Sequence, residues 1–246
     1  MRILQLTDLH IGEEGEDTYG VDVRSNFLKI IDFAKTLQPD RIVLTGDLCF
    51  RSGNTDIYFW IKYLLDQLAV PFDVISGNHD DPAQLAKVFG TFSDLHRGEL
   101  YFARNFGECP ALFLDTTVGS LSQRQLDWLQ QQLQAIQQEL LLFMHHPPLI
   151  AGVPYMDKSH ALKPESRKAL QDILFGFSWQ IHAFCGHYHV EKIVAEKNVA
   201  VHITPSCFFQ IDPVAETFRI DHHRIGLREI IVKDKKIRQR VRYLPT

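Results

Sequence analysis

Residues 1–10 read MRILQLTDLH, a short and mostly apolar run from Ile3 to Leu6 that is followed by Asp8 and His10. Apolar residues at neighbouring positions, instead of alternating ones, are typical of a strand that is buried on both faces. Four later runs share this character and are predicted as further strands: Arg41 to Leu44, Phe72 to Ile75, Leu140 to Met144 and Ile181 to Cys185. The sequence therefore predicts a central sheet with other layers on both sides.

Polar side chains follow each of these five runs. In chain order they are Asp8-Leu9-His10, Gly46-Asp47, Gly77-Asn78-His79-Asp80, His145-His146-Pro147-Pro148 and Gly186-His187-Tyr188-His189. Ligands of open α/β sheets lie beyond the carboxyl ends of the strands, so we expect these side chains to converge. His187 and His189, two apart on a segment expected to be extended, should share one face and can bind one centre or two adjacent ones. Glycines 46, 77 and 186 allow the backbone to turn there without a Cβ clash.

Helical patterns alternate with the strands in the first half of the chain. Apolar residues at three- and four-residue spacing predict helices over Phe27 to Leu37, Ile57 to Leu68 and Leu126 to Ile136, and Ser122 and Asp81 are expected to cap helices. Further strands are predicted at Leu100 to Ala103, Ala111 to Leu114, Ile193 to Ala195, Val199 to Ile203, Arg228 to Val232 and Ile237 to Tyr243. Together these elements predict an α/β fold, a four-layer α/β/β/α sandwich of two mixed sheets flanked by helices.

No Pro- or Gly-rich linker divides the chain, so we expect a single domain over residues 1–246. Residues 205–246 should form a strand-rich extension of that domain, and the stretch from Ile150 to Lys163 is expected to be a long ordered loop near the site.

Composition limits the range of partners and compartments. The chain has 246 residues, 45% of them hydrophobic, and a formal net charge of -4, so no global positive field is present to hold nucleic acid. No stretch approaches the roughly 20 apolar residues of a membrane span. The four cysteines have no paired spacing, which indicates neither a disulfide framework nor a thiolate zinc site. We expect a cytoplasmic protein, with a homodimer left open.

The residue types after the strands suit a pair of metal ions. Imidazole, carboxylate and amide ligands without thiolates favour Mn, Fe, Zn or Co, as two divalent or mixed-valence ions that share one carboxylate. Two such ions, less the charges of Asp8 and Asp47, leave the site positive and suited to an anionic phosphate ester of small size. Each motif alone also has a structural explanation: a turn at Asp8, a helix start at Asp81, or a strand exit before Pro147. The remaining histidines are predicted to be structural or on the surface: His96, His160, His182, His202, His222 and His223.

In combination and order, the five motifs resemble those of the calcineurin-like metallophosphoesterase superfamily, over residues 1 to about 190. The resemblance implies the metallo-dependent phosphatase fold. It also implies that Asp8, His10, Asp47 and His189 bind the first metal and that Asp47, Asn78, His145 and His187 bind the second, with Asp47 as the bridge.

A narrower resemblance points to the class III 3',5'-cyclic-nucleotide phosphodiesterases of bacteria. It rests on Gly20-Val21-Asp22, Thr204-Pro205-Ser206, Gln210 and Phe218-Arg219-Ile220-Asp221, whereas Ile225-Gly226-Leu227 stands where those enzymes have Pro-Gly-aromatic. The implied reaction is hydrolysis of a phosphodiester such as cyclic AMP by a metal-bridging hydroxide. His79 directly follows a ligand and is the candidate general acid.

Three other functions fit parts of the pattern. The main alternative is a broad phosphodiesterase or a phosphomonoesterase, acting for example on glycerophosphodiesters. A nuclease is disfavoured by the acidic balance of charge. A non-catalytic scaffold of the same fold would be expected to lack some metal-site residues, and here the expected set is complete.

Overall fold

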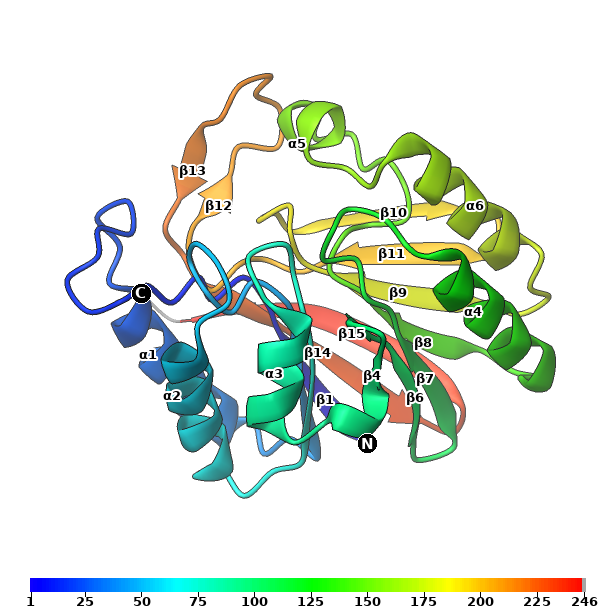
Figure 1. The fold of residues 1–246 in the computed structure, drawn as a ribbon, viewed down its shortest axis with the longest axis horizontal. Helices are drawn as coiled ribbons and strands as arrows, with labels where there is room; N and C mark the ends of the chain where they lie inside the picture. The colour runs from blue at the N-terminus through cyan, green and yellow to red at the C-terminus, as the bar shows by residue number, and fades with distance from the viewer. Residues whose placement is uncertain (245–246) are drawn as a thin grey trace.

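Two mixed sheets lie face to face, and helices cover their outer faces (Figure 1). The protein is described from a computed structural model, which covers residues 1–244. The predicted four-layer α/β/β/α sandwich is confirmed. The layers follow from the apolar strands, since residues such as Leu4, Val43 and Leu142 are fully buried between a neighbouring sheet and the helices.

The first sheet has the strand order β15-β14-β1-β2-β3. Strands β1, β2 and β3 are parallel, and the C-terminal hairpin adds β14 antiparallel to β1. Their bounds are Arg2–Leu6 (β1), Arg41–Thr45 (β2), Phe72–Ile75 (β3), Gly226–Lys233 (β14) and Lys236–Tyr243 (β15). The strand-rich C-terminal segment thus completes the sheet that starts at residue 2. The last two residues of the predicted extension, 245–246, lie outside the described residues.

The second sheet has the order β10-β11-β9-β8-β7-β6, with antiparallel strands at both edges. Its strands are Phe102–Phe106 (β6), Cys109–Phe113 (β7), Leu140–Phe143 (β8), Ile181–Cys185 (β9), Lys192–Glu196 (β10) and Val199–Ile203 (β11). Two short hairpins stand apart from the sheets: Leu95–His96 (β4) with Glu99–Leu100 (β5), and Gln210–Ile211 (β12) with Ile220–His222 (β13).

Four helices cover the predicted helical patterns and caps, although α1 and α2 begin before the first predicted apolar residues, Phe27 and Ile57. They are α1 (Val23–Thr36), α2 (Thr55–Asp66), α3 (Pro82–Phe89) and α4 (Gln123–Ala135), and a 3-10 turn η1 (Phe92–Asp94) follows α3. The Asp81 side chain accepts the N–H groups of Ala83 and Gln84, and Ser122 accepts that of Gln125, as expected of N-caps. The α1 cap is Asp22, so this residue of the narrower motif has a structural role.

Two helices were not predicted. Helix α5 (Pro154–Ser159) lies inside the segment expected to be a loop, from Ile150 to Lys163, and α6 (Pro164–Phe175) follows it directly. The segment is ordered and lies near the site as predicted, but the expectation that it is a loop throughout was wrong, because it contains α5. Helix α6 buries only Leu170 and Leu174 fully, so its apolar face is too narrow to produce a clear periodic pattern.

The carboxyl ends of the five predicted strands meet at one edge of the sandwich. Hydrogen bonds join the two sheets close to that edge, from Gln5 Nε2 to the carbonyl of Cys185 (3.2 Å) and from the N–H of Cys207 to the carbonyl of Thr7 (3.1 Å). Loops from both sheets are therefore held against one another. No helix within residues 1–244 is both long enough and apolar enough to cross a membrane.

Candidate metal centre

Five of the predicted metal ligands have a left-handed backbone. The φ angles are 54° at Asp8, 46° at His10, 52° at Asp47, 68° at His187 and 50° at His189. Such a conformation costs a non-glycine residue about 1–3 kcal/mol, and it clusters at functional sites. The expectation that residues 187–189 are extended was therefore wrong. Both histidines reach the site, each in a different group of side chains that could bind a metal ion.

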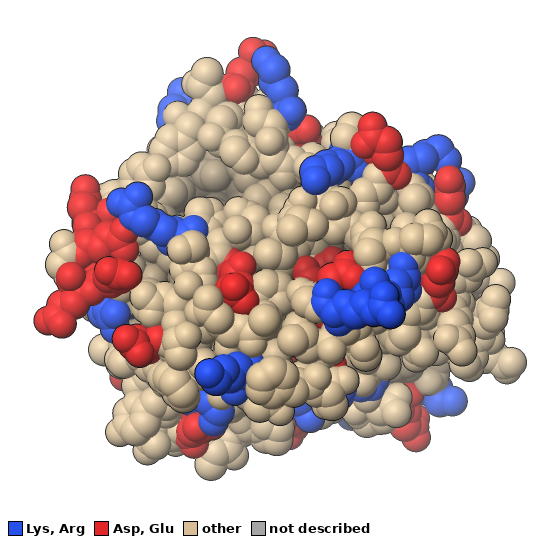
Figure 2. Space-filling view, in the orientation of Figure 1, with Lys and Arg blue, Asp and Glu red and all other residues tan. Residues whose placement is uncertain are grey.

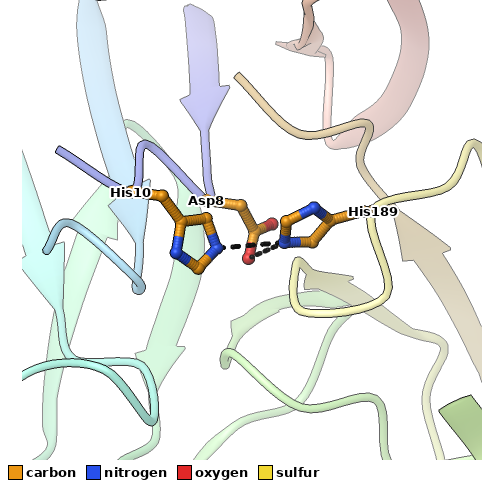
Figure 3. Close-up of side chains that lie close together, drawn as sticks. All are labelled: Asp8, His10 and His189. Atoms are coloured by element: carbon orange, nitrogen blue, oxygen red, sulfur yellow. Dashed lines mark hydrogen bonds and ion pairs between the residues drawn. The ribbon is translucent and has the colours of Figure 1, made fainter. Parts of the chain in front are cut away.

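The first group consists of Asp8, His10 and His189 (Figure 3). His10 Nε2 lies 3.1 Å from His189 Nε2, which lies 3.4 Å from Asp8 Oδ1. The other nitrogen of His189, Nδ1, is 3.1 Å from the carbonyl oxygen of Phe209. Because a carbonyl only accepts, Nδ1 carries the proton and Nε2 presents its lone pair to the group. A cation would satisfy all three side chains at once.

The second group consists of Asp47, His145 and His187. His145 donates from Nδ1 to the carbonyl of Thr45 (2.8 Å), and His187 donates from Nε2 to the carbonyl of His160 (2.7 Å). These bonds leave His145 Nε2 and His187 Nδ1 as the nitrogens that can ligate. His145 Nε2 is buried and lies 3.2 Å from Asp47 Oδ2, without the geometry of a hydrogen bond. Backbone carbonyls that orient imidazoles in this way are typical of metal sites.

Asp47 lies between the two groups. Its Oδ2 is 3.6 Å from His10 Nε2 and 3.2 Å from His145 Nε2, so one carboxylate oxygen faces a histidine of each group. The side chain is 2% exposed, which removes water as an alternative partner. This geometry is what a bridging carboxylate requires.

Asn78 and His79 complete the predicted set at the wall of a cavity of about 470 Å³ that opens over both groups. The backbone N–H of His79 donates to Asp47 Oδ1 (2.9 Å), and His79 Nδ1 donates to the carbonyl of Arg51 (3.2 Å). His79 Nε2 is therefore free toward the cavity. His79, His10 and Asp47 each have a potential ligand atom within 4.8 Å of those of the other two, so a role of His79 as a metal ligand has to be tested against a role as an acid.

Asp80 belongs to the same motif but has a different environment. Its carboxylate accepts the N–H groups of Leu48 (3.1 Å) and Gly77 (2.9 Å) and the hydroxyl of Tyr58 (3.0 Å). These bonds tie the loop after β2 to the loop after β3. Asp80 therefore positions the loop that carries Asp47.

Glycine is required at residue 186 by close approach. A Cβ atom there would lie 2.7 Å from Asp8 Oδ2 and closer still to Thr7 Oγ1, although φ at this residue is not positive. A Cβ at Gly77 would likewise lie too close to Asp47 Oδ1. Turn hydrogen bonds begin at both residues, from the N–H of Asp80 to the carbonyl of Gly77 and from the N–H of Tyr188 to the carbonyl of Gly186, so the expected turns without a Cβ clash are confirmed. Of these three glycines, Gly46 has a positive φ, 91°.

We expect Gly186→Ala to destabilise the protein by about 1–3 kcal/mol through overpacking and to lower metal content by displacing Asp8. Thermal unfolding in the presence of Mn²⁺ and elemental analysis measure the two effects. Gly176→Ala is the matched control, since its nearest neighbour would lie at 3.4 Å and its φ is -76°. Equal melting temperatures for the two variants would contradict the close-approach argument.

The buried histidines and carboxylates of the two groups shift one another's pKa values. Burial opposes the charge on His145, but the carboxylates of Asp47 and Asp8 raise its pKa to about 9. Burial, together with nearby histidines, lowers the pKa of His10 and that of His187 to about 3 each. The histidines hold the pKa of Asp47 well below its usual value despite burial. Without metal, His145 is thus the protonated partner of two carboxylates.

Metal binding should therefore release a proton from His145. A pKa raised to about 9 means that the proton is held at pH 7.5 and lost as the pH rises through 9. We expect the apparent Mn²⁺ affinity to rise about tenfold per pH unit between pH 7 and pH 9 and then to level off. Competition with a chelator measures this slope. His145→Asn should reduce the slope by about one proton, and an unchanged slope in that variant would contradict the assignment.

Several residues that the sequence does not identify as site residues support the candidate ligands. His160 was predicted to be structural or on the surface, but its carbonyl orients His187 and its side chain lines the cavity. The ring of His146 lies 4.0 Å from that of His187 and its Nδ1 pairs with Thr116 Oγ1 at 2.9 Å, so it packs behind a predicted ligand. The backbone carbonyl of Phe209 orients His189. No sequence motif reports a backbone contact of this kind.

The chain is similar to known proteins over most of its length. Residues 1–191 match the family model described as calcineurin-like phosphoesterase. The chain belongs to the calcineurin-like phosphoesterase family. That fold implies a site for two divalent metal ions, and the His and Asp groups above supply candidate ligands.

Individual relatives cover most of the chain. A protein of Fibrobacter succinogenes named "Probable cyclic nucleotide phosphodiesterase" is 35% identical, over 89% of this chain and 84% of its own. One of Arcobacter nitrofigilis named "Probable glycerophosphodiester phosphodiesterase GpdQ" is 30% identical, over 77% of this chain and 72% of its own. Among solved structures, a dimetal phosphatase from Danio rerio superimposes with a TM-score of 0.67 over 93% of this chain and 94% of that chain, at 13% identity, which shows the shared fold.

Proposed function

We propose that this protein is a dinuclear-metal phosphodiesterase whose substrate is a 3',5'-cyclic nucleotide such as cyclic AMP. The observation that carries the proposal is the position of Asp47, with one carboxylate oxygen between His10 and His145. The name of the Fibrobacter relative supports the cyclic-nucleotide substrate. The match of residues 1–191 to the phosphoesterase family model supports the reaction class.

The residues present fit two ions. Asp8, His10, His189 and Asp47 would hold one, and Asp47, Asn78, His145 and His187 the other. When bound, such a pair supplies Lewis acidity toward phosphoryl oxygens and a nucleophile from water at neutral pH. The donor set of nitrogen and oxygen atoms without thiolate favours Mn, Fe, Zn or Co.

His79 is the proposed general acid. The carbonyl of Arg51 accepts a hydrogen bond from Nδ1 of the ring, and Asp47 accepts one from the backbone N–H of His79, so both the ring and the backbone of this residue are held. Nε2 is then the nitrogen that transfers a proton to the departing alkoxide of the ester. An unactivated ribose alkoxide is a poor leaving group, so its departure depends on this proton.

A panel of substrates tests the function. Protein reconstituted with Mn²⁺ is assayed on cyclic AMP and cyclic GMP, on glycerophosphodiesters and on phosphomonoesters. We expect cyclic nucleotides to have the highest kcat/KM and monoesters the lowest. A higher kcat/KM on glycerophosphodiesters would favour the alternative of a broad phosphodiesterase, which the name of the Arcobacter relative also supports. Preference for monoesters would contradict the proposal.

We further propose that the protein is located in the cytoplasm. All four cysteines, which lie within residues 1–244, are free and buried, as a reducing compartment permits. The homodimer left open by the sequence is tested by light scattering of the metal-loaded protein.

A further inference from the structure

Aromatic side chains form one wall of the cavity above the metal centre. They come from segments far apart in the chain: Tyr19 before α1, Phe50 after β2, Tyr155 in α5, Phe208 and Phe209 before β12, and Phe218 before β13. We name this set the aromatic wall. The hairpin that carries Phe218 is joined to α5 by a hydrogen bond from the N–H of Tyr155 to the carbonyl of Ala215 (3.2 Å). Figure 2 shows a hollow with uncharged walls beneath this hairpin.

The aromatic wall continues directly from the proposed metal ligands. The ring of Phe208 lies 5.1 Å from that of His10, and the ring of Phe209 lies 5.3 Å from that of His189. Tyr19 follows, 6.2 Å from Phe208 and 5.7 Å from Phe209. Two ring contacts therefore lead from a metal ligand to the outer part of the cavity.

The outer rings of the wall are exposed, whereas the inner ones are not. Tyr19 is 57% exposed and Phe218 42%, compared with 2% for Phe208 and 4% for Phe209. The Tyr19 and Phe218 rings are 5.8 Å apart and tilted by 52°. Large neighbouring rings left in water beside a site mark a surface that a ligand covers. They can offer a stacking face to a planar group.

The charges of the cavity-lining residues argue against a ligand with a second anionic group. Among the described residues that line the cavity, Arg51 is the only Lys or Arg, and its guanidinium is already paired with Glu16. No free cation is left there to hold a second phosphate or a charged headgroup. The cavity of about 470 Å³ falls within the range of roughly 300–1,000 Å³ typical of small-molecule sites.

We infer that Tyr19 and Phe218 are specificity-determining residues that bind the base of the nucleotide. This inference rests on the proposed function and extends it to the part of the substrate away from phosphorus. A base sandwiched between two rings needs about 7 Å, two contacts of about 3.5 Å each, which is more than the 5.8 Å present. The base therefore stacks against the cavity side of the two rings, with its phosphate at the metal centre.

The test compares a diester with a base and a diester without one. Tyr19→Ala and Phe218→Ala are assayed on cyclic AMP and on glycerophosphoethanolamine. We expect kcat/KM on cyclic AMP to fall about 5- to 100-fold, through KM, as for loss of one stacked base. On glycerophosphoethanolamine kcat/KM should change less than about twofold, because this diester has no base that could stack on the missing ring. Tyr19→Phe should retain the wild-type values. Tyr63→Ala, which removes a ring that is 62% exposed outside the cavity, is the matched control.

Equal losses on both diesters, or no loss on cyclic AMP, would overturn the inference. A second measurement separates it from the proposed function. Equilibrium dialysis of the Mn²⁺-loaded protein compares AMP with ribose 5-phosphate, which has the same phosphate but no base. We expect AMP to bind about tenfold more tightly than ribose 5-phosphate in the wild type, and this difference to become smaller in Tyr19→Ala. If cyclic AMP is not hydrolysed, the proposed function fails, and the dialysis still decides the base site. Equal binding of both ligands to the wild type overturns it.

Discussion

Replacing Asp47 by asparagine is expected to abolish more activity than any other single change. Its carboxylate faces a histidine of each group, and the neutral amide removes the negative charge that both ions would share. Loss of metal-ion catalysis is worth several kcal/mol, so we expect kcat/KM on phosphodiesters to fall about 10³-fold or more. Metal content should fall from two ions per chain toward zero or one. Elemental analysis after gel filtration measures this directly.

The fold should tolerate this change, because asparagine has the shape of aspartate and can still accept the backbone N–H of His79. Asp127→Asn, on an exposed position of α4, is the matched control and should leave activity and metal content unaltered. An Asp47→Asn protein with two ions and near-normal activity would show that the carboxylate does not bridge.

His79→Ala is expected to have an effect that depends on the leaving group. Without the acid, hydrolysis of cyclic AMP should slow about 10²–10⁴-fold. Hydrolysis of a nitrophenyl ester should slow much less, since nitrophenolate leaves without a proton. Parallel assays of kcat on the two esters measure the difference.

Metal analysis distinguishes the acid from a ligand. His79→Ala should keep both ions, whereas Asn78→Ala and His187→Ala should lower metal occupancy. The first two changes are at neighbouring positions of the same cavity wall, so they form a matched pair. Equal rate losses on both esters, or loss of metal in His79→Ala, would assign His79 to the ligands, a role that its distance to His10 and Asp47 also allows.

The layers and several element bounds could be predicted because they depend on local patterns. Strands such as β3 and β9 have the predicted bounds, since burial on both faces requires consecutive apolar residues. Helix α4 begins after Ser122 as predicted, because a cap is a contact over three residues. Helix α6 was missed because its stability comes from packing of a narrow face, with only Leu170 and Leu174 fully buried.

The sequence by itself predicted which side chains converge, because each motif comes shortly after a strand and parallel strands of one sheet end at one edge. Only the tertiary structure decided which nitrogen of each imidazole is free, since the carbonyls of Thr45, His160 and Phe209 come from other loops. The aromatic wall was also decided only by the tertiary structure, because Tyr19 and Phe218 are 199 positions apart in the chain and meet through packing alone. A contact between distant segments leaves no local pattern, and local patterns are what a single sequence displays.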